Sequence, residues 1–172
     1  MHRTHPAPKR WITTTFALLV LALSLPGYAK VLHEERSVHT RIIVEDERNL
    51  RCLKFTLVRE NSRQTCMDRN DPQRLVFDYA KMTLSALLLK PDPERILIIG
   101  LGGGTLPNAL RDILPSAVID TVEIDEAVVR VAKQFFGFVE DQQNRVYVQD
   151  ARVFGKRAAL RGEQYDLIIL DA

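Results

Sequence analysis

Three glycines at alternate positions, Gly100, Gly102 and Gly104, follow an apolar run in the stretch ILIIGLGGGTLP. A GxGxG cluster at a strand end lets the backbone turn sharply and approach a bound ligand closely. A phosphate loop of the GxxxxGK[ST] type needs a lysine after its last glycine, where Thr105 stands here. The dinucleotide pattern GxGxxG needs a glycine at that same position, which weakens NAD without excluding it. The spacing therefore favours a ligand that presents no phosphate to the loop.

Two acidic residues stand where the next two strands are expected to end. Glu123 closes the run TVE, and Asp150 follows RVYVQ. Glu123 would accept hydrogen bonds from both hydroxyls of a ribose, and Asp150 would meet the amino group of an adenine. A lone carboxylate at a strand end is more often a helix cap. Together with the glycines, the two predict a nucleoside sulfonium such as S-adenosylmethionine, bound across the carboxyl ends of the strands.

The second half of the chain alternates between apolar strands and helices. The expected strands are RILIIG, AVIDTVEI, RVYVQ and YDLIIL, and the expected helices are TLPNALRDIL, DEAVVRVAKQFFG and ARVFGKRAALR. Continuous apolar strands separated by helices predict a parallel sheet covered on both faces. The run LIIL suits the middle of a sheet, and as an exposed edge it would invite aggregation. We therefore expect the chain to be a fragment, truncated after its fourth strand.

The segment before this sheet reads as short strands around the turn EDERN. A helix is predicted to follow over residues 72–89, with Asp71 as its N-cap and Pro72 at its first position. Its apolar stripe would consist of Leu75, Val76, Tyr79, Met82, Thr83, Ala86 and Leu87. The fold class is therefore α/β, with a small β-rich domain at the N-terminus.

The first 29 residues have the three-part layout of a secretory signal peptide. A positive stretch precedes the apolar run WITTTFALLVLALSL, and the small residues Gly27 and Ala29 suit a cut before Lys30. An uncleaved membrane anchor and a cytosolic amphipathic segment are the alternatives, although the run is short for a membrane span. The first two cases place the domain outside the cytoplasm, so we expect an exported protein, periplasmic or secreted.

Cys52 and Cys66 lie 14 positions apart in a segment that reads as a β-hairpin. A disulfide that closes a loop of this size adds about 3 kcal/mol of stability in an oxidising compartment. Two buried thiols are the alternative, because the sequence does not show whether the side chains face each other.

The composition argues against several classes of partner. Of the 24 Lys and Arg residues, three lie in the leader, so the rest of the chain holds 21 against 22 acidic residues. This balance leaves no basic surface for nucleic acid. His33 and His39 lack the spacing of metal ligands, and no GxSxG motif is present. We expect neither a nucleic-acid partner nor a metal.

Five segments together resemble the spermidine synthase (polyamine aminopropyltransferase) family, and most closely its bacterial spermidine-synthase-like branch. They are QTCMDRNDPQRLVFDYAKM, ILIIGLGGGTLP, VEIDEAVV, VQDARVF and YDLIILDA. The resemblance implies a Rossmann-like fold of the class I S-adenosylmethionine-dependent methyltransferase type, which continues past the fourth strand. The expected parts are a signal peptide or anchor over residues 1–29, a β-hairpin domain over 30–71 and an incomplete nucleoside-binding domain over 72–172.

The resemblance also implies a reaction and its residues. The family moves an aminopropyl group from decarboxylated S-adenosylmethionine to an amine such as putrescine, and methylthioadenosine leaves. A carboxylate must take the ammonium proton, since only the free amine is nucleophilic. By resemblance that base is Asp171, while Glu123 holds the ribose and Asp150 the adenine. Tyr79 matches a tyrosine of the active site, and Gln64 matches a glutamine of the cofactor-binding N-terminal domain.

Two positions depart from the family pattern. The loop GGGDGG usually carries an aspartate that holds the cofactor's amino group, where this chain has Gly103, and Ala80 replaces a usual His or Gln. The missing aspartate also removes a charge that would repel the carboxylate of unmodified S-adenosylmethionine.

Three functions therefore stay open: an aminopropyltransferase, a methyltransferase that uses S-adenosylmethionine, and a catalytically inactive nucleoside-binding or interaction protein. The 172-residue chain alone is expected to be inactive. For the enzymes we expect a small-molecule amine as substrate. A homodimer stays open, as does membrane contact through an uncleaved leader.

Overall fold

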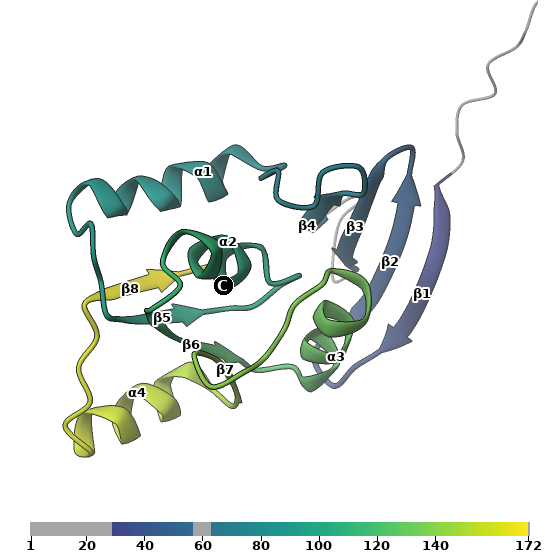
Figure 1. Cartoon of the computed structure of the whole chain (residues 1–172). Helices are drawn as coiled ribbons and strands as arrows, with labels where there is room; N and C mark the ends of the chain where they lie inside the picture. The colour runs from purple at the N-terminus through teal and green to yellow at the C-terminus, as the bar shows by residue number, and fades with distance from the viewer. Residues whose placement is uncertain (1–28, 57–62, 172) are drawn as a thin grey trace, which may run out of the picture.

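The computed structural model describes residues 29–56 and 63–171, which form two sheets with helices packed on and between them (Figure 1). Apart from Ala29, the predicted leader lies outside the described residues. An antiparallel sheet of order β1-β2-β3-β4 consists of β1 (Lys30–Arg36), β2 (Arg41–Glu47), β3 (Leu50–Phe55) and β4 (Arg63–Asp68). A parallel sheet of order β7-β6-β5-β8 consists of β5 (Arg95–Ile99), β6 (Val118–Glu123), β7 (Asn144–Val148) and β8 (Leu167–Leu170). The predicted α/β class and the β-rich N-terminal part are confirmed.

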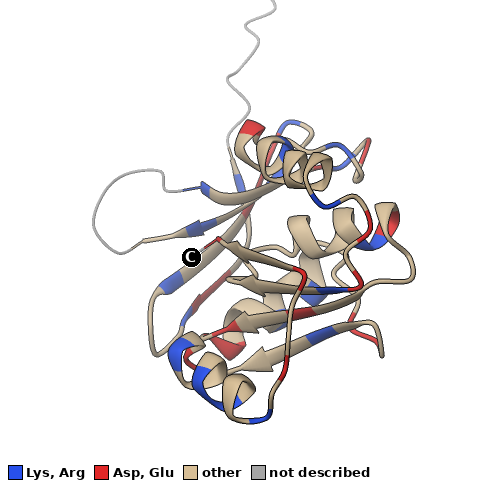
Figure 2. Cartoon of the chain, turned by 90° about the vertical axis from the view of Figure 1, so that its left-hand side faces the viewer, with Lys and Arg blue, Asp and Glu red and all other residues tan. Residues whose placement is uncertain are grey.

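Helices cover both faces of the parallel sheet, as its apolar strands predicted. Because side chains alternate along a strand, Ile96 and Ile98 of β5 pack into the core beneath α2 (Thr105–Ile113) and α1 (Asp78–Leu84). Leu97 points the other way, into a core with Phe154 of α4 (Ala151–Leu160). Basic residues lie along the exposed side of α4, as Figure 2 shows, so its charge is that of one solvated helix face.

The helix α3 (Glu126–Phe135) joins the two sheets. Val128 and Val131 pack against the antiparallel sheet, in a core that includes Ile42. Val129, on another side of the helix, packs against Leu101 in the glycine loop. Figure 1 shows α3 between the two sheets, so this helix helps to hold the glycine loop in place relative to β1–β4.

The predicted helix over residues 72–89 is wrong at its start, and its predicted stripe is confirmed only in part. The α-helix begins only at Asp78 and ends at Leu84, and a 3-10 turn, η1 (Ser85–Leu88), follows. Leu75 instead forms a β-bridge with Met67, and Arg74 pairs with Asp68 of β4. These contacts hold residues 71–77 along the antiparallel sheet, so Asp71 does not cap a helix.

Of the predicted stripe, Leu75 and Leu87 pack against the core that contains Ile96. Ala80 is the buried residue of α1, whereas Met82 is 72% exposed. None of the helices in residues 29–56 and 63–171 is long and apolar enough to cross a membrane.

Cys52 and Cys66 face each other across β3 and β4 and form a disulfide. Both residues are buried, and their Cα atoms lie 4.1 Å apart. The hairpin that the sequence predicted for this pair is thus present, and the covalent bond fixes the register of β4.

Candidate active site at the ends of the parallel strands

A cavity of about 690 Å³ lies between β4 and the carboxyl ends of the parallel strands. Figure 1 shows β5 and β8 with their arrowheads directed toward the antiparallel sheet. The predicted residues that line the cavity are Gly100, Gly102, Glu123, Asp150, Gln64, Tyr79 and Asp171. The structure thus brings together every ligand-contacting residue proposed from the sequence except Gly104.

The strand order sets these residues in a row. Asp150 follows β7, Glu123 ends β6, Gly100 follows β5, and Asp171 follows β8, in the same order as the strands of the sheet. The chain moves outward from β5 to β6 and β7 and then returns to the other side of β5, so the switch of direction lies between β5 and β8. Open α/β sheets bind ligands at such a point. With strands about 4.8 Å apart, the row spans roughly 14 Å.

The glycine loop turns into the cavity through left-handed backbone conformations. Gly100 has a φ of 98° and Gly102 a φ of 53°, which other residues rarely adopt. Gly104 also has a positive φ, but it precedes α2 and does not line the cavity. A Cβ atom there would lie 2.8 Å from Phe138, so this glycine serves close packing.

The carboxylate of Glu123 is buried and holds two backbone groups. Oε2 accepts the N–H of Leu101 and Oε1 accepts the N–H of Asp125, each at 3.0 Å. Each carboxylate oxygen has two lone pairs, so both oxygens keep the capacity to accept a hydroxyl of a ligand. Glu123 is therefore preorganised by the loop that it faces.

Asp150 is both a helix cap and part of the cavity wall. Its side chain accepts the backbone N–H groups of Arg152 and Val153 at the start of α4. Hydrogen bonds from the side chain and backbone of Arg152 lower the pKa of Asp150 to about 2. The cap and ligand interpretations, which the sequence set against each other, are compatible at this residue.

Asp171 and Tyr79 meet at the β8 side of the cavity. The backbone N–H of Asp171 donates to the carbonyl of Ile99, and Oδ2 lies 3.4 Å from the hydroxyl of Tyr79. Burial raises the pKa of Asp171 above the usual range of a carboxyl, and the hydrogen bond from Tyr79 offsets part of that rise. Burial, with the adjacent Asp171, raises the pKa of Tyr79 to about 12, so the tyrosine is a neutral donor.

The antiparallel sheet contributes Gln64 at a β-bulge. The register pairs Leu53 with Thr65 and then Lys54 with Arg63, so Gln64 is the extra residue. Bulges re-aim side chains next to active sites, and Gln64 lines the cavity. Thr65, its neighbour, also lines the cavity and was missed, because no sequence pattern links it to the glycine loop.

The cavity carries an excess of negative charge. Two arginines missed by the sequence analysis also line it, but Arg63 pairs with Glu47, and Arg152 pairs with Asp150. Within the described part of the chain, Glu123 and Asp171 have no cationic partner. Two uncompensated carboxylates favour a ligand that carries positive charge.

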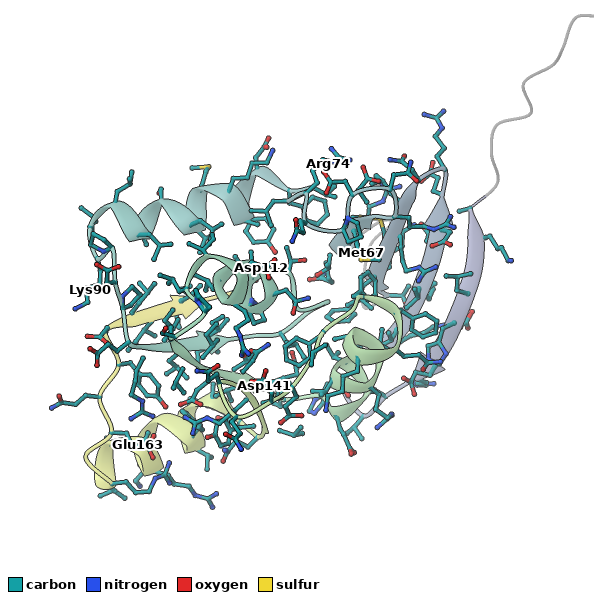
Figure 3. All side chains as sticks on the ribbon, in the orientation of Figure 1. Met67, Arg74, Lys90, Asp112, Asp141 and Glu163 are labelled. Carbon is teal, nitrogen blue, oxygen red and sulfur yellow. A yellow bond between two sulfur atoms is a disulfide. The ribbon has the colours of Figure 1, made fainter. Side chains whose placement is uncertain are left out.

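A second cavity, of about 610 Å³, lies on the other side of the glycine loop. Met67, Arg74, Asp112 and Asp141, labelled in Figure 3, are among its walls. Cys66 borders it, whereas none of the predicted ligand-contacting residues does. Arg74 is paired with Asp68, and Asp141 with an arginine of α2, so these charges neutralise one another.

Comparison with known proteins identifies the family. A model of the spermine/spermidine synthase domain matches residues 77–172. A polyamine aminopropyltransferase of Vibrio vulnificus is 46% identical over 165 residues, which are 94% of this chain and 55% of that protein. An eEF1A lysine and N-terminal methyltransferase of Xenopus laevis is 34% identical over 116 residues, or 63% of this chain and 17% of that protein.

A solved spermidine synthase, in complex with the transition-state analogue AdoDATO, shares the fold. Its TM-score is 0.61 at 23% identity, with 83% of this chain and 48% of that chain covered. The chain spans about half the length of the Vibrio vulnificus relative and less of the Xenopus laevis one. On the domain match over residues 77–172, the chain belongs to the spermine/spermidine synthase family.

Proposed function

We propose that the protein containing this sequence transfers an aminopropyl group from decarboxylated S-adenosylmethionine to a small amine. The observation that carries the proposal is the row Asp150, Glu123, Gly100 and Asp171 along one cavity. The first three residues suit an adenine, a ribose and the backbone approach to a nucleoside. Asp171 then stands beyond them as a carboxylate without a cationic partner among the described residues. Similarity to a polyamine aminopropyltransferase over 94% of the chain supports the same activity.

Asp171 has the properties of the general base. A neutral amine attacks the carbon next to the sulfonium sulfur, so that a C–N bond forms, the C–S bond breaks and methylthioadenosine leaves. The amine becomes neutral only when its ammonium form loses a proton, which the carboxylate of Asp171 accepts. Tyr79 donates to that carboxylate over 3.4 Å, which is longer than an ordinary O–H···O hydrogen bond of about 2.8 Å. The contact is therefore weak, and the carboxylate of Asp171 keeps acceptor capacity for the amine.

Methyl transfer from S-adenosylmethionine is the second candidate. The observation that favours it is Gly103, because no acidic side chain stands there to repel the carboxylate of that cofactor. The similarity to an eEF1A lysine and N-terminal methyltransferase supports the same alternative.

The direct test offers the full-length protein each cofactor with putrescine as the amine. We expect methylthioadenosine to form from decarboxylated S-adenosylmethionine, and Asp171→Asn to slow its formation about 10²- to 10⁴-fold while cofactor binding is kept. The exposed Asp92→Asn is the matched control and should not change the rate.

Two results would contradict this proposal. Formation of S-adenosylhomocysteine alone would establish methyl transfer instead. If neither product forms and calorimetry detects no nucleoside binding, both enzymatic functions fail, and the inactive interaction protein remains.

The ribose assignment is tested by Glu123→Gln. An amide has one acceptor oxygen fewer, so it cannot hold the loop N–H, the N–H of Asp125 and two ribose hydroxyls together. We expect the Kd of methylthioadenosine to rise about 10- to 100-fold, the loss of a charged hydrogen bond of about 1.5–3 kcal/mol. Glu126→Gln, on the exposed side of α3, should leave the Kd unchanged. An unaltered Kd in Glu123→Gln would show that the ribose lies elsewhere.

The role of Tyr79 is visible in the pH dependence of kcat. Asp171 accepts a proton only when ionised, so the rate falls as the pH drops through its pKa. The hydrogen bond from Tyr79 lowers that pKa, and Tyr79→Phe should therefore move the acidic limb to higher pH. If the acidic limb of the profile does not move in Tyr79→Phe, measured with the same amine, Tyr79 does not affect the pKa of the base.

We also propose that the protein is exported. The leader layout of residues 1–29 supports this proposal, and so does the Cys52–Cys66 disulfide, since such bonds persist in oxidising compartments. Peptide mass mapping of protein from its native cells should give Lys30 as the first residue and a cross-linked Cys52–Cys66 peptide. Recovery of the intact leader with two free thiols would place the protein in the cytoplasm.

A further inference from the structure

Thr65 links β4 of the antiparallel sheet to the glycine loop of the parallel sheet. Its Oγ1 accepts the backbone N–H of Gly103 at 2.9 Å, across 38 positions of sequence, and both groups are buried. Only 5% of Thr65 is exposed, although it lines the cavity. A backbone N–H in such a place needs an acceptor, and Thr65 supplies it.

The methyl group of Thr65 explains why position 103, which it faces, is a glycine. Gly103 is not among the glycines with positive φ, so its backbone conformation does not require glycine. A Cβ atom at position 103, however, would lie 2.6 Å from Cγ2 of Thr65. A Cβ atom on Gly102 would likewise lie 2.8 Å from Oγ1. Thr65 therefore packs directly on two successive residues of the loop.

The loop is held by two side chains from outside. Glu123 accepts the N–H of Leu101, and Thr65 accepts the N–H of Gly103. Gly102 lies between these two anchors and lines the cavity. Because both neighbours are fixed, the position of Gly102 in the cavity depends on Thr65 as well as on Glu123.

We propose that Thr65 is a positioning residue for nucleoside binding. Its hydroxyl fixes the glycine loop at the distance that the ligand requires, and its methyl group keeps position 103 free of a side chain. This inference rests on the proposed function, because it takes the ligand to be an adenine nucleoside.

The test compares Thr65→Val with Thr65→Ser in the full-length protein. Valine keeps the shape but leaves the N–H of Gly103 without an acceptor, so we expect the Kd of methylthioadenosine to rise about tenfold in calorimetry. Serine keeps the hydroxyl and should bind within about threefold of the parent protein. Ile42→Val, in the core of the antiparallel sheet, lowers stability without touching the loop and should bind normally. Equal affinity in Thr65→Val and the parent would overturn the proposal.

Two further measurements test the contact between Thr65 and Gly103 itself, one with a double mutant and one without any ligand. Gly103→Ala should weaken binding, and adding Thr65→Ser, which removes the methyl group but keeps the hydroxyl, should recover part of the loss, because contacting residues are not additive. Additive losses would contradict the contact. Amide exchange at Gly103, measured without ligand, should be faster in Thr65→Val than in Thr65→Ser. Failure of the parent protein to bind any adenine nucleoside would refute the proposed function, while exchange rates that do not differ would refute the role of Thr65.

Discussion

Four backbone N–H groups of the glycine loop, those of Gly100, Leu101, Gly103 and Gly104, donate to acceptors that tie the loop to its surroundings. The carbonyl of Val122 accepts the N–H of Gly100, and the carbonyl of Leu101, within the loop, accepts the N–H of Gly104. The other two are satisfied from opposite sides, by Glu123 at the end of β6 and by Thr65 on β4. Because an unpaired buried N–H is costly, both sheets must stand at fixed distances from this loop. The loop thus connects the two sheets and also lines the cavity.

The position of β4 has its own covalent support. The Cys52–Cys66 disulfide holds β4 to β3, directly beside Thr65 and Gln64. The bulge at Gln64 shifts the register of β4 where this strand lines the cavity. A strand of six residues thereby contributes to the sheet, to the disulfide and to the cavity wall.

The electrostatics of the cavity separate residues that support the fold from residues available to a ligand. Arg63 and Arg152 are neutralised by carboxylates, and Asp150 is partly committed to capping α4. Among the described residues, the carboxylate of Glu123 accepts hydrogen bonds from backbone groups, and the carboxylate of Asp171 accepts one from a neutral tyrosine. The charge left over is negative, which favours a positively charged ligand.

The sequence by itself determined the parallel sheet, because strands apolar on both faces can only be buried between helices. It also determined most of the residues that line the cavity, since the carboxyl ends of parallel strands must meet at one edge. Tertiary structure alone decided where α1 begins, because the pairing of Leu75 and Arg74 with β4 overrides a good local cap at Asp71. It likewise decided the role of Thr65, whose partner lies 38 positions away. Local patterns encode periodicity and strand ends, whereas contacts between two sheets depend on how those sheets pack.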